Sequence, residues 1–374
     1  MSRRRAEWVF PGFVLVALWL GVGLAVSAQR AHGSRVRRHL PRAGAPTPTR
    51  TLTPTPPPAA PTATATPAAT ATPTRTPTPG AGPSLEGCPV FPSDNVWNVA
   101  VDTLPVDANS AAYIGSIGGS AGVHPDFGSG TWDGGPIGIP YVAVAGSQPL
   151  VPVSFEYADE SDPGPYPIPP DAPIEGGSAS TGDRHVLVLD RDRCRLYELF
   201  SAYPQPGGGW RAGSGAVFDL ASHALRPAGW TSADAAGLPI LPGLVRYDEV
   251  SAGAIRHAIR FTAPRTRRAY VWPARHFASS QTDPALPPMG QRFRLKASYD
   301  LSGFAPEVRV ILMAMKVYGL ILADNGSAWF VSGVPDERWN NDVLVGQLRL
   351  VKGSDFEAVD ASGLMLDPDS GQTR

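Results

Sequence analysis

Short apolar runs dominate the chain from about residue 85 onward, separated by segments rich in glycine and proline. Runs of about four to eight apolar or alternating residues between turn-forming residues are typical of β-strands. This pattern predicts strands at 150–157, 185–190, 195–201, 257–262, 269–272, 292–298 and 320–323.

Two short connections predict hairpins. Residues 191–193 and 324–327 each lie between two strand-like runs, and the second connection is followed by an apolar segment at 329–332. Connections of this length favour antiparallel pairing of the strands that they join. We therefore expect each pair of flanking runs to pair, including 320–323 with 329–332.

One segment, residues 307–318, has the pattern of an α-helix. Pro306 precedes it and Gly319 follows it, which are the residues preferred just inside the start and just past the end of a helix. An apolar stripe at helical spacing comprises Val308, Ile311, Leu312 and Met315. Together with the strands, this predicts a mainly β fold: an antiparallel β-sandwich or jelly-roll-like domain with long loops and one packed α-helix.

The N-terminus has the pattern of an export signal. Arg3, Arg4 and Arg5 precede an apolar run, and small residues at 26–28 suit a signal peptidase. We expect residues 1–28 to be a signal peptide, or an uncleaved membrane anchor as the alternative. Localisation is then secreted or cell-surface/periplasmic, with the protein tethered if the segment is not cleaved.

Composition divides the rest of the chain in two. Residues 29–84 are basic at first and then rich in proline and threonine, which predicts a disordered spacer because few apolar residues offset the entropy of ordering. Residues 85–374 are long enough to form a single β-rich extracellular domain. They contain 32 Asp and Glu and 22 Lys and Arg, a net charge of about −10. This excludes nucleic-acid binding by bulk charge, and leaves the N-terminal segment as the only expected membrane contact.

Both cysteines lie in the expected domain. An even number of cysteines in an exported chain predicts a disulfide between Cys88 and Cys194. Two separate buried thiols are the alternative.

Alternation along 292–298 places Arg292, Arg294 and Lys296 on one face of a strand. Such a row could bind an anionic polymer, or pair with surface carboxylates instead. Asp183, Arg184 and His185 form a second group, just before a strand, that suits acid–base chemistry and substrate orientation. His257 is a further candidate for substrate binding or for a place in the core.

Carboxylates are the richest source of candidate chemistry. Glycoside hydrolysis needs two, one protonated and one ionised. The candidates for this pair are Asp183, Asp234, Asp248 and Glu249, with His185 assisting. Each has a structural alternative, such as capping a helix at Asp234 or a turn at Asp248.

Seven tryptophans remain after residue 85, and exposed ones can stack on sugar rings. Trp132 and Trp230 are the candidates for substrate binding, with core packing as the alternative. The histidines lack the spacing of a known zinc motif, so we expect neither a metal nor a cofactor.

Four sequence segments carry a resemblance to a known group of proteins. They are 161–169 (SDPGPYPIP), 183–185 (DRH), 232–239 (SADAAGLP) and 323–326 (ADNG). The chain resembles, over most of residues 88–360, a family of secreted bacterial domains of unassigned function. The resemblance implies an extracellular module behind a low-complexity spacer, and it implies no activity.

Two classes of function follow from these features. The first is an extracellular polysaccharide-active enzyme: a glycoside hydrolase with a carboxylate pair, or a lyase in which His185 or His257 is the base and the row of cations binds a uronate. The second is a non-catalytic carbohydrate-binding or cell-surface structural module, in which Trp132, Trp210 and Trp329 form a platform. The expected partner in both is a polysaccharide or cell-wall glycan.

Overall fold

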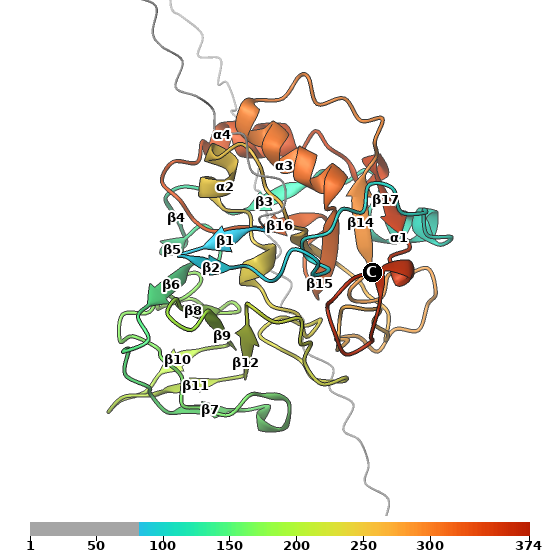
Figure 1. Ribbon diagram of the computed structural model, residues 1–374. Helices are drawn as coiled ribbons and strands as arrows, with labels where there is room; N and C mark the ends of the chain where they lie inside the picture. Colours follow the sequence, from blue (N-terminus) through green and yellow to red (C-terminus); the bar gives the residue numbers. More distant parts are fainter. Residues whose placement is uncertain (1–81) are drawn as a thin grey trace, which may run out of the picture. The chain divides into compact units, whose positions relative to one another are not determined.

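The computed structural model describes residues 82–374 (Figure 1). The expected leader at 1–28 and nearly all of the spacer lie outside the described residues. The described residues belong to one compact unit and are mainly β, as the sequence predicts. Among them, no helix is both long and apolar enough to span a bilayer.

The largest sheet has six strands in the order β17-β14-β15-β13-β16-β3. The pairs β13–β15 and β16–β3 are parallel, and the other neighbours are antiparallel. The strands are β3 (His124–Asp126), β13 (Ile259–Ala263), β14 (Arg292–Leu295), β15 (Leu320–Asn325), β16 (Phe330–Ser332) and β17 (Phe356–Val359).

A second sheet has four strands in the order β12-β9-β8-β6, and its central strand β8 is buried along its whole length. Its strands are β6 (Tyr141–Val144), β8 (Val186–Asp190), β9 (Arg195–Phe200) and β12 (Ser214–Asp219). A three-stranded sheet, β10-β11-β7, lies at the lower end of the view in Figure 1. It consists of β7 (Val153–Phe155), β10 (Tyr203–Pro204) and β11 (Trp210–Ala212), and two small hairpins are β1–β2 (Ser84–Leu85, Cys88–Pro89) and β4–β5 (Thr131–Trp132, Gly135–Pro136).

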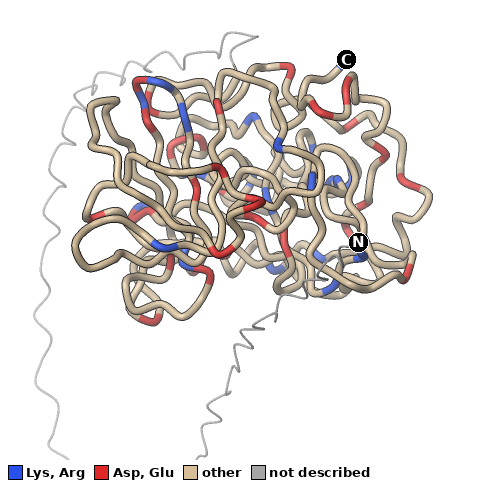
Figure 2. The backbone as a smooth tube through the Cα atoms, turned by 90° about the horizontal axis from the view of Figure 1, so that it is seen from below, with Lys and Arg blue, Asp and Glu red and all other residues tan. Residues whose placement is uncertain are grey.

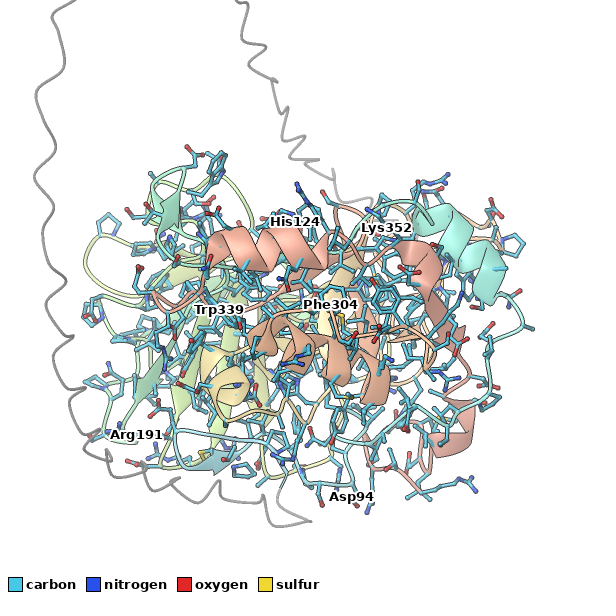
Figure 3. The ribbon with its side chains drawn as sticks, turned by 90° about the horizontal axis from the view of Figure 1, so that it is seen from above. Asp94, His124, Arg191, Phe304, Trp339 and Lys352 are labelled. Carbon is cyan, nitrogen blue, oxygen red and sulfur yellow. A yellow bond between two sulfur atoms is a disulfide. The ribbon has the colours of Figure 1, made fainter. Side chains whose placement is uncertain are left out.

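The expected helix is present as α3 (Pro306–Val317), with Pro306 in its first turn and its apolar stripe buried. Three shorter helices accompany it: α1 (Ser110–Ile117), α2 (Tyr247–Ser251) and α4 (Asn341–Leu348). Helix α1 is rich in small residues and α2 has only five residues, so neither shows a long apolar stripe. Trp339, labelled in Figure 3, packs edge-on against Phe127 and Tyr247 and so ties the segment before α4 to α2.

The strand pairings were predicted in part. The hairpin of β8 and β9 is confirmed. The expected pairing of 320–323 with 329–332 is wrong, because β13 lies between β15 and β16 and pairs with both. Residues 269–272 form no strand, although Tyr270 makes one isolated bridge to Met289.

One hydrophobic core joins the two larger sheets. It includes Leu187 and Leu189 from β8 and Phe261 from β13. In the six-stranded sheet Phe261 stacks on Trp329, at 5.4 Å between ring centroids, and Trp329 stacks on Phe356 at 5.0 Å. A smaller core, centred on Tyr166, lies on the opposite face of β8.

The disulfide between Cys88 and Cys194 is confirmed. It joins β2, near the start of the described chain, to the turn between β8 and β9. Cys88 is completely buried, and the bond lies near Arg191, which Figure 3 labels at the edge of the molecule.

Candidate functional site

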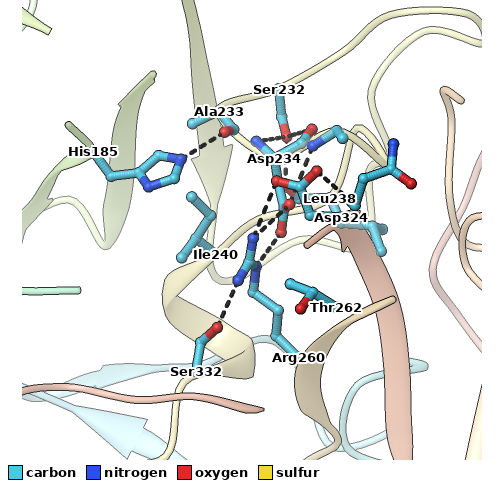
Figure 4. Close-up of polar contacts among 12 residues, drawn as sticks. His185, Ser232, Ala233, Asp234, Leu238, Ile240, Arg260, Thr262, Asp324 and Ser332 are labelled. Atoms are coloured by element: carbon cyan, nitrogen blue, oxygen red, sulfur yellow. Dashed lines mark hydrogen bonds and ion pairs between the residues drawn. The ribbon is translucent and has the colours of Figure 1, made fainter. Parts of the chain in front are cut away.

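A buried polar cluster lies where the segment 231–241 passes between the two larger sheets (Figure 4). At its centre is Asp234, which is completely buried. Its two carboxylate oxygens accept hydrogen bonds from Arg260, from Nε at 2.6 Å and from Nη2 at 2.9 Å. Ser232 holds the loop in shape, since its hydroxyl contacts the carbonyls of Asp234 and Leu238.

Arg260 is placed by strand β13. The register puts it opposite Ser332 on β16, and its Nη1 donates to the Ser332 hydroxyl at 2.6 Å. Its Nη2 also lies 3.5 Å from the Asp324 carboxylate at the end of β15. Burial alone would lower the pKa of Arg260, but the ion pair with Asp234 outweighs burial and raises it. Arg260 is therefore a fixed positive charge shared by two carboxyl groups.

His185 comes from the residue just before β8 and provides the second positive charge. Its Nδ1 lies 2.6 Å from Glu175, and its Nε2 lies 3.0 Å from the carbonyl oxygen of Ala233. Both neighbours are hydrogen-bond acceptors, so both ring nitrogens donate and the ring is an imidazolium. Burial lowers the pKa of His185, but the Glu175 carboxylate more than offsets this and raises it to about 9. His185 is thus unable to accept a proton at neutral pH.

Two carboxyl groups beside this cluster reach solvent. The side chains of Asp126, at the end of β3, and Asp183 are both exposed. Although water reaches Asp126, the surrounding protein desolvates it and, together with the negative charge of Glu175, raises its pKa to about 6. Desolvation also raises the pKa of Asp183, with Glu175 and Asp234 acting in the same direction and His185 and Arg260 opposing them.

Asp324 and Glu198 complete the acidic groups. Asp324 is 21% exposed, and its burial and its proximity to Asp234 raise its pKa well above the usual range. Glu198 on β9 is completely buried, and its carboxyl accepts hydrogen bonds from the backbone N–H groups of Ile240 and Leu241. Burial raises the pKa of Glu198 to about 7.

The structure therefore brings together three of the five catalytic candidates, Asp183, His185 and Asp234. The other two lie in a separate group. Asp248 is exposed and forms an ion pair with Arg338 at 2.8 Å. Glu249 bridges Arg246 at 2.6 Å and the buried His257 at 3.0 Å.

Three arginines expected to bind substrate are bonded within the protein instead: all three donate to main-chain carbonyls, and Arg294 also pairs with the Glu357 carboxylate at 2.8 Å. Arg184 is buried and donates to the carbonyl oxygens of Ser178, Ser180 and Ala202. Arg292 and Arg294 lie on one face of β14 as expected, but that face is covered. Their guanidinium groups donate to the carbonyl oxygens of Val96, Val101, Leu104 and Tyr318. The expectation of an open row of cations is wrong for these two residues, because the segment 96–104 packs over them.

The tryptophans differ strongly in exposure. Trp210 and Trp329 are buried in the two cores, so the expected three-ring platform does not form. Trp230 is half-buried beside Arg226. Trp132 is 75% exposed.

Sequence reasoning missed Asp126 and Glu198, and it left Glu175, Arg260 and Asp324 out of the candidate site. Asp126 ends strand β3, a position that could have drawn attention to it. Glu198 interrupts an apolar strand, and a lone carboxylate in such a run is a signal of a buried functional or structural group.

Within residues 82–374, no three His, Cys, Asp or Glu side chains are arranged to hold a metal ion. Charges elsewhere are mixed, and Figure 2 shows Asp and Glu distributed along the whole tube with Lys and Arg scattered between them.

Comparisons with known proteins find nothing similar. No family model, no curated protein and no solved structure matches the chain. The fold and the cluster thus define the protein at the level of a class: a mainly β domain with a buried carboxylate–arginine–histidine network and two carboxyl groups open to solvent beside it.

Proposed function

We propose that this protein is an extracellular glycoside hydrolase acting on a polysaccharide or cell-wall glycan. The observation that carries the proposal is the pair of exposed carboxyl groups, Asp126 and Asp183, beside two fixed positive charges. Glycoside hydrolysis requires one carboxyl group that keeps its proton and one that is ionised.

The environment distinguishes the two carboxyl groups. Asp126 has a pKa of about 6, because desolvation and Glu175 disfavour its charged form. It is the general acid that protonates the leaving oxygen. Desolvation raises the pKa of Asp183 as well, but two positive charges, His185 and Arg260, oppose that shift, whereas only Arg260 opposes it at Asp126. Asp183 is the base or nucleophile.

The buried residues have a supporting role. Asp234 holds Arg260 through two hydrogen bonds, and Glu175 holds His185. These pairs keep the positive charges in place without contacting a substrate, since Asp234 is completely buried. Side chains locked by a second layer of hydrogen bonds are a general requirement of precise catalytic sites.

Elimination is less well supported than hydrolysis. A lyase needs a base to abstract a proton and a cation to neutralise the uronate carboxylate. His185 has both nitrogens engaged with acceptors, and His257 is completely buried. Arg292 and Arg294, the expected cations, point into the protein.

The test is release of reducing ends from a panel of polysaccharides by residues 82–374. Asp126→Asn and Asp183→Asn should each lower kcat roughly 100-fold or more, since each removes one partner of the acid–base pair. Asp102→Asn, a change at an exposed carboxylate between β2 and α1, serves as the matched control and should leave kcat unchanged.

The pH profile tests the assignment of the acid. Activity should fall as pH rises through about 6, because Asp126 then loses the proton that it must donate. Release that continues undiminished in both Asn variants would rule out this site.

A further inference from the structure

We propose that Trp132, on the hairpin β4–β5, is a sugar-stacking residue that selects uncharged glycan chains for the Asp126–Asp183 site. The inference rests on the proposed function for the reaction, but its binding step can be tested without turnover. It assigns a substrate class, a neutral polymer of sugar rings.

The hairpin is built to hold its shape. Trp132 pairs with Gly135, and the two residues between them, Asp133 and Gly134, have φ values of 50° and 86°. Two consecutive residues with positive φ form the tight turn that matches the twist of antiparallel strands, and Asp-Gly is a preferred sequence for it. The position of Trp132 is therefore fixed by the backbone.

The hairpin packs directly against the loop that carries Glu175. A Cβ atom added at Gly135 would lie 2.0 Å from the carbonyl carbon of Gly176, and one added at Gly177 would lie 2.9 Å from the oxygen of Gly134. Such contacts mean that the two backbones touch with no side chain between them. Gly176 follows Glu175, which holds His185, so the hairpin is anchored to the catalytic cluster.

The same segment carries Asp126. Strand β3 ends at Asp126, and backbone hydrogen bonds from Gly128 to Ile137 and from Ile137 to Gly130 continue the ladder toward the hairpin. Trp132 lies six positions after Asp126, so their Cα atoms are at most about 20 Å apart at a rise of about 3.4 Å per residue. This separation is within the length of one oligosaccharide.

The exposure of Trp132 is unusual for this protein. Among residues 82–374, the other large hydrophobic side chains that are exposed are aliphatic: Val106, Leu150, Val271, Met313, Leu350 and Leu366. An indole offers a large, rigid apolar face at little cost in side-chain entropy, and a sugar ring presents a matching face of C–H groups. A fixed, open indole beside an acid–base pair is suited to stacking on a sugar.

Charge indicates which sugars fit. Asp133 and the ionised Asp183 place negative charge around the hairpin and the site, and the Glu337 carboxylate accepts a hydrogen bond from the N–H of Gly130 beside the hairpin. A polyuronate would be repelled by these carboxylates, whereas a neutral chain would not. The substrate inferred is therefore a neutral glycan.

The experiment measures two quantities for the wild type, Trp132→Ala and Trp132→Phe. The first is retardation in native gels that contain neutral or uronate polymers. The second is kcat and KM on a neutral polymer and on a short aryl glycoside that is too small to reach the hairpin. Leu150→Ala removes an exposed side chain elsewhere and is the matched control.

We expect Trp132→Ala to weaken retardation and to raise the polymer KM roughly tenfold, as expected for one aromatic stacking contact. The kcat and the values for the short substrate should stay unchanged, and Trp132→Phe should restore much of the affinity.

Loss of retardation in Trp132→Ala supports the inference even if no product is released, in which case only the proposed hydrolysis fails. If Trp132→Ala cleaves the polymer with an unchanged KM and shows unchanged retardation, the inference is overturned and the proposed function stands. The inference is also overturned if the wild type is retarded by uronate polymers alone, or by no polymer at all.

Discussion

Single residues in this protein act according to what surrounds them. Arg292 and Arg260 lie on neighbouring parts of the same sheet, yet Arg292 donates to backbone carbonyls and Arg260 binds two carboxylates. Asp248 and Asp234 are likewise both carboxylates close to a loop, and one is exposed whereas the other is completely buried. Residue type alone does not separate a structural group from a chemical one.

Glu198 gives the sharpest prediction at this scale. Its folded pKa of about 7 lies above its ordinary value of 4.5, because burial disfavours the charge. The folded state therefore binds this proton more tightly, so its contribution to stability is complete below pH 4.5 and is lost as pH rises through 7. At about 1.4 kcal/mol per pH unit, the loss between these two pKa values is of the order of 3 kcal/mol.

Glu198→Gln should remove this pH dependence. One amide oxygen can still accept from Ile240 and Leu241, as Oε1 does. We expect the variant to gain stability relative to the wild type as pH rises from 4.5 to 8, measured by urea denaturation at each pH. Glu156→Gln, at an exposed position, is the control. Parallel pH profiles for the wild type and Glu198→Gln would contradict this account.

At the scale of elements, the position of β13 organises the site. Its insertion between β15 and β16 places Arg260 opposite Ser332 and near Asp324. A simple hairpin of β15 with β16 would leave no strand to carry the arginine there. The insertion of β13 therefore determines where the positive charge lies.

The disulfide is the covalent link between elements, and its removal is predictable. It joins residues 106 positions apart, so reduction frees a long loop in the unfolded chain. In the chain-entropy model, a loop of this size corresponds to about 4 to 5 kcal/mol of stability. Cys88→Ser with Cys194→Ser should lower the free energy of unfolding by about that amount in guanidinium titrations. A loss well under 1 kcal/mol would show that β1–β2 is held by its packing alone.

At the scale of the molecule, the two larger sheets share one core. Leu187 and Leu189 from β8 belong to the same cluster as Ile259 and Phe261 from β13, so the facing sides of the two sheets are buried against each other. Sheets that share a buried interface are expected to unfold together.

Residues 82–374 should therefore unfold in one transition. Far-ultraviolet circular dichroism reports the strands, and tryptophan fluorescence reports Trp97 and Trp329 in the core. The two probes should give coincident curves in urea. Separate midpoints would indicate that the sheets are independent units and that the cluster lies between two domains.

The sequence by itself determined the local features of this protein. Apolar runs located β8 and β9, an apolar stripe with flanking proline and glycine located α3, and an even number of cysteines, with export expected, predicted the disulfide. These features depend on neighbouring residues or on a single possible partner. They can be recognised without knowing how the chain folds back on itself.

Only the tertiary structure decided the strand order and the site. The six acidic groups of the cluster and its rim come from positions 126, 175, 183, 198, 234 and 324, and their proximity depends on how distant segments pack. Burial and neighbouring charge, which shift the pKa values of Asp126, Asp183, Glu198 and Asp324, are properties of that packing. The same reason explains Arg292 and Arg294: alternation placed them correctly on one face, and the fold then covered that face.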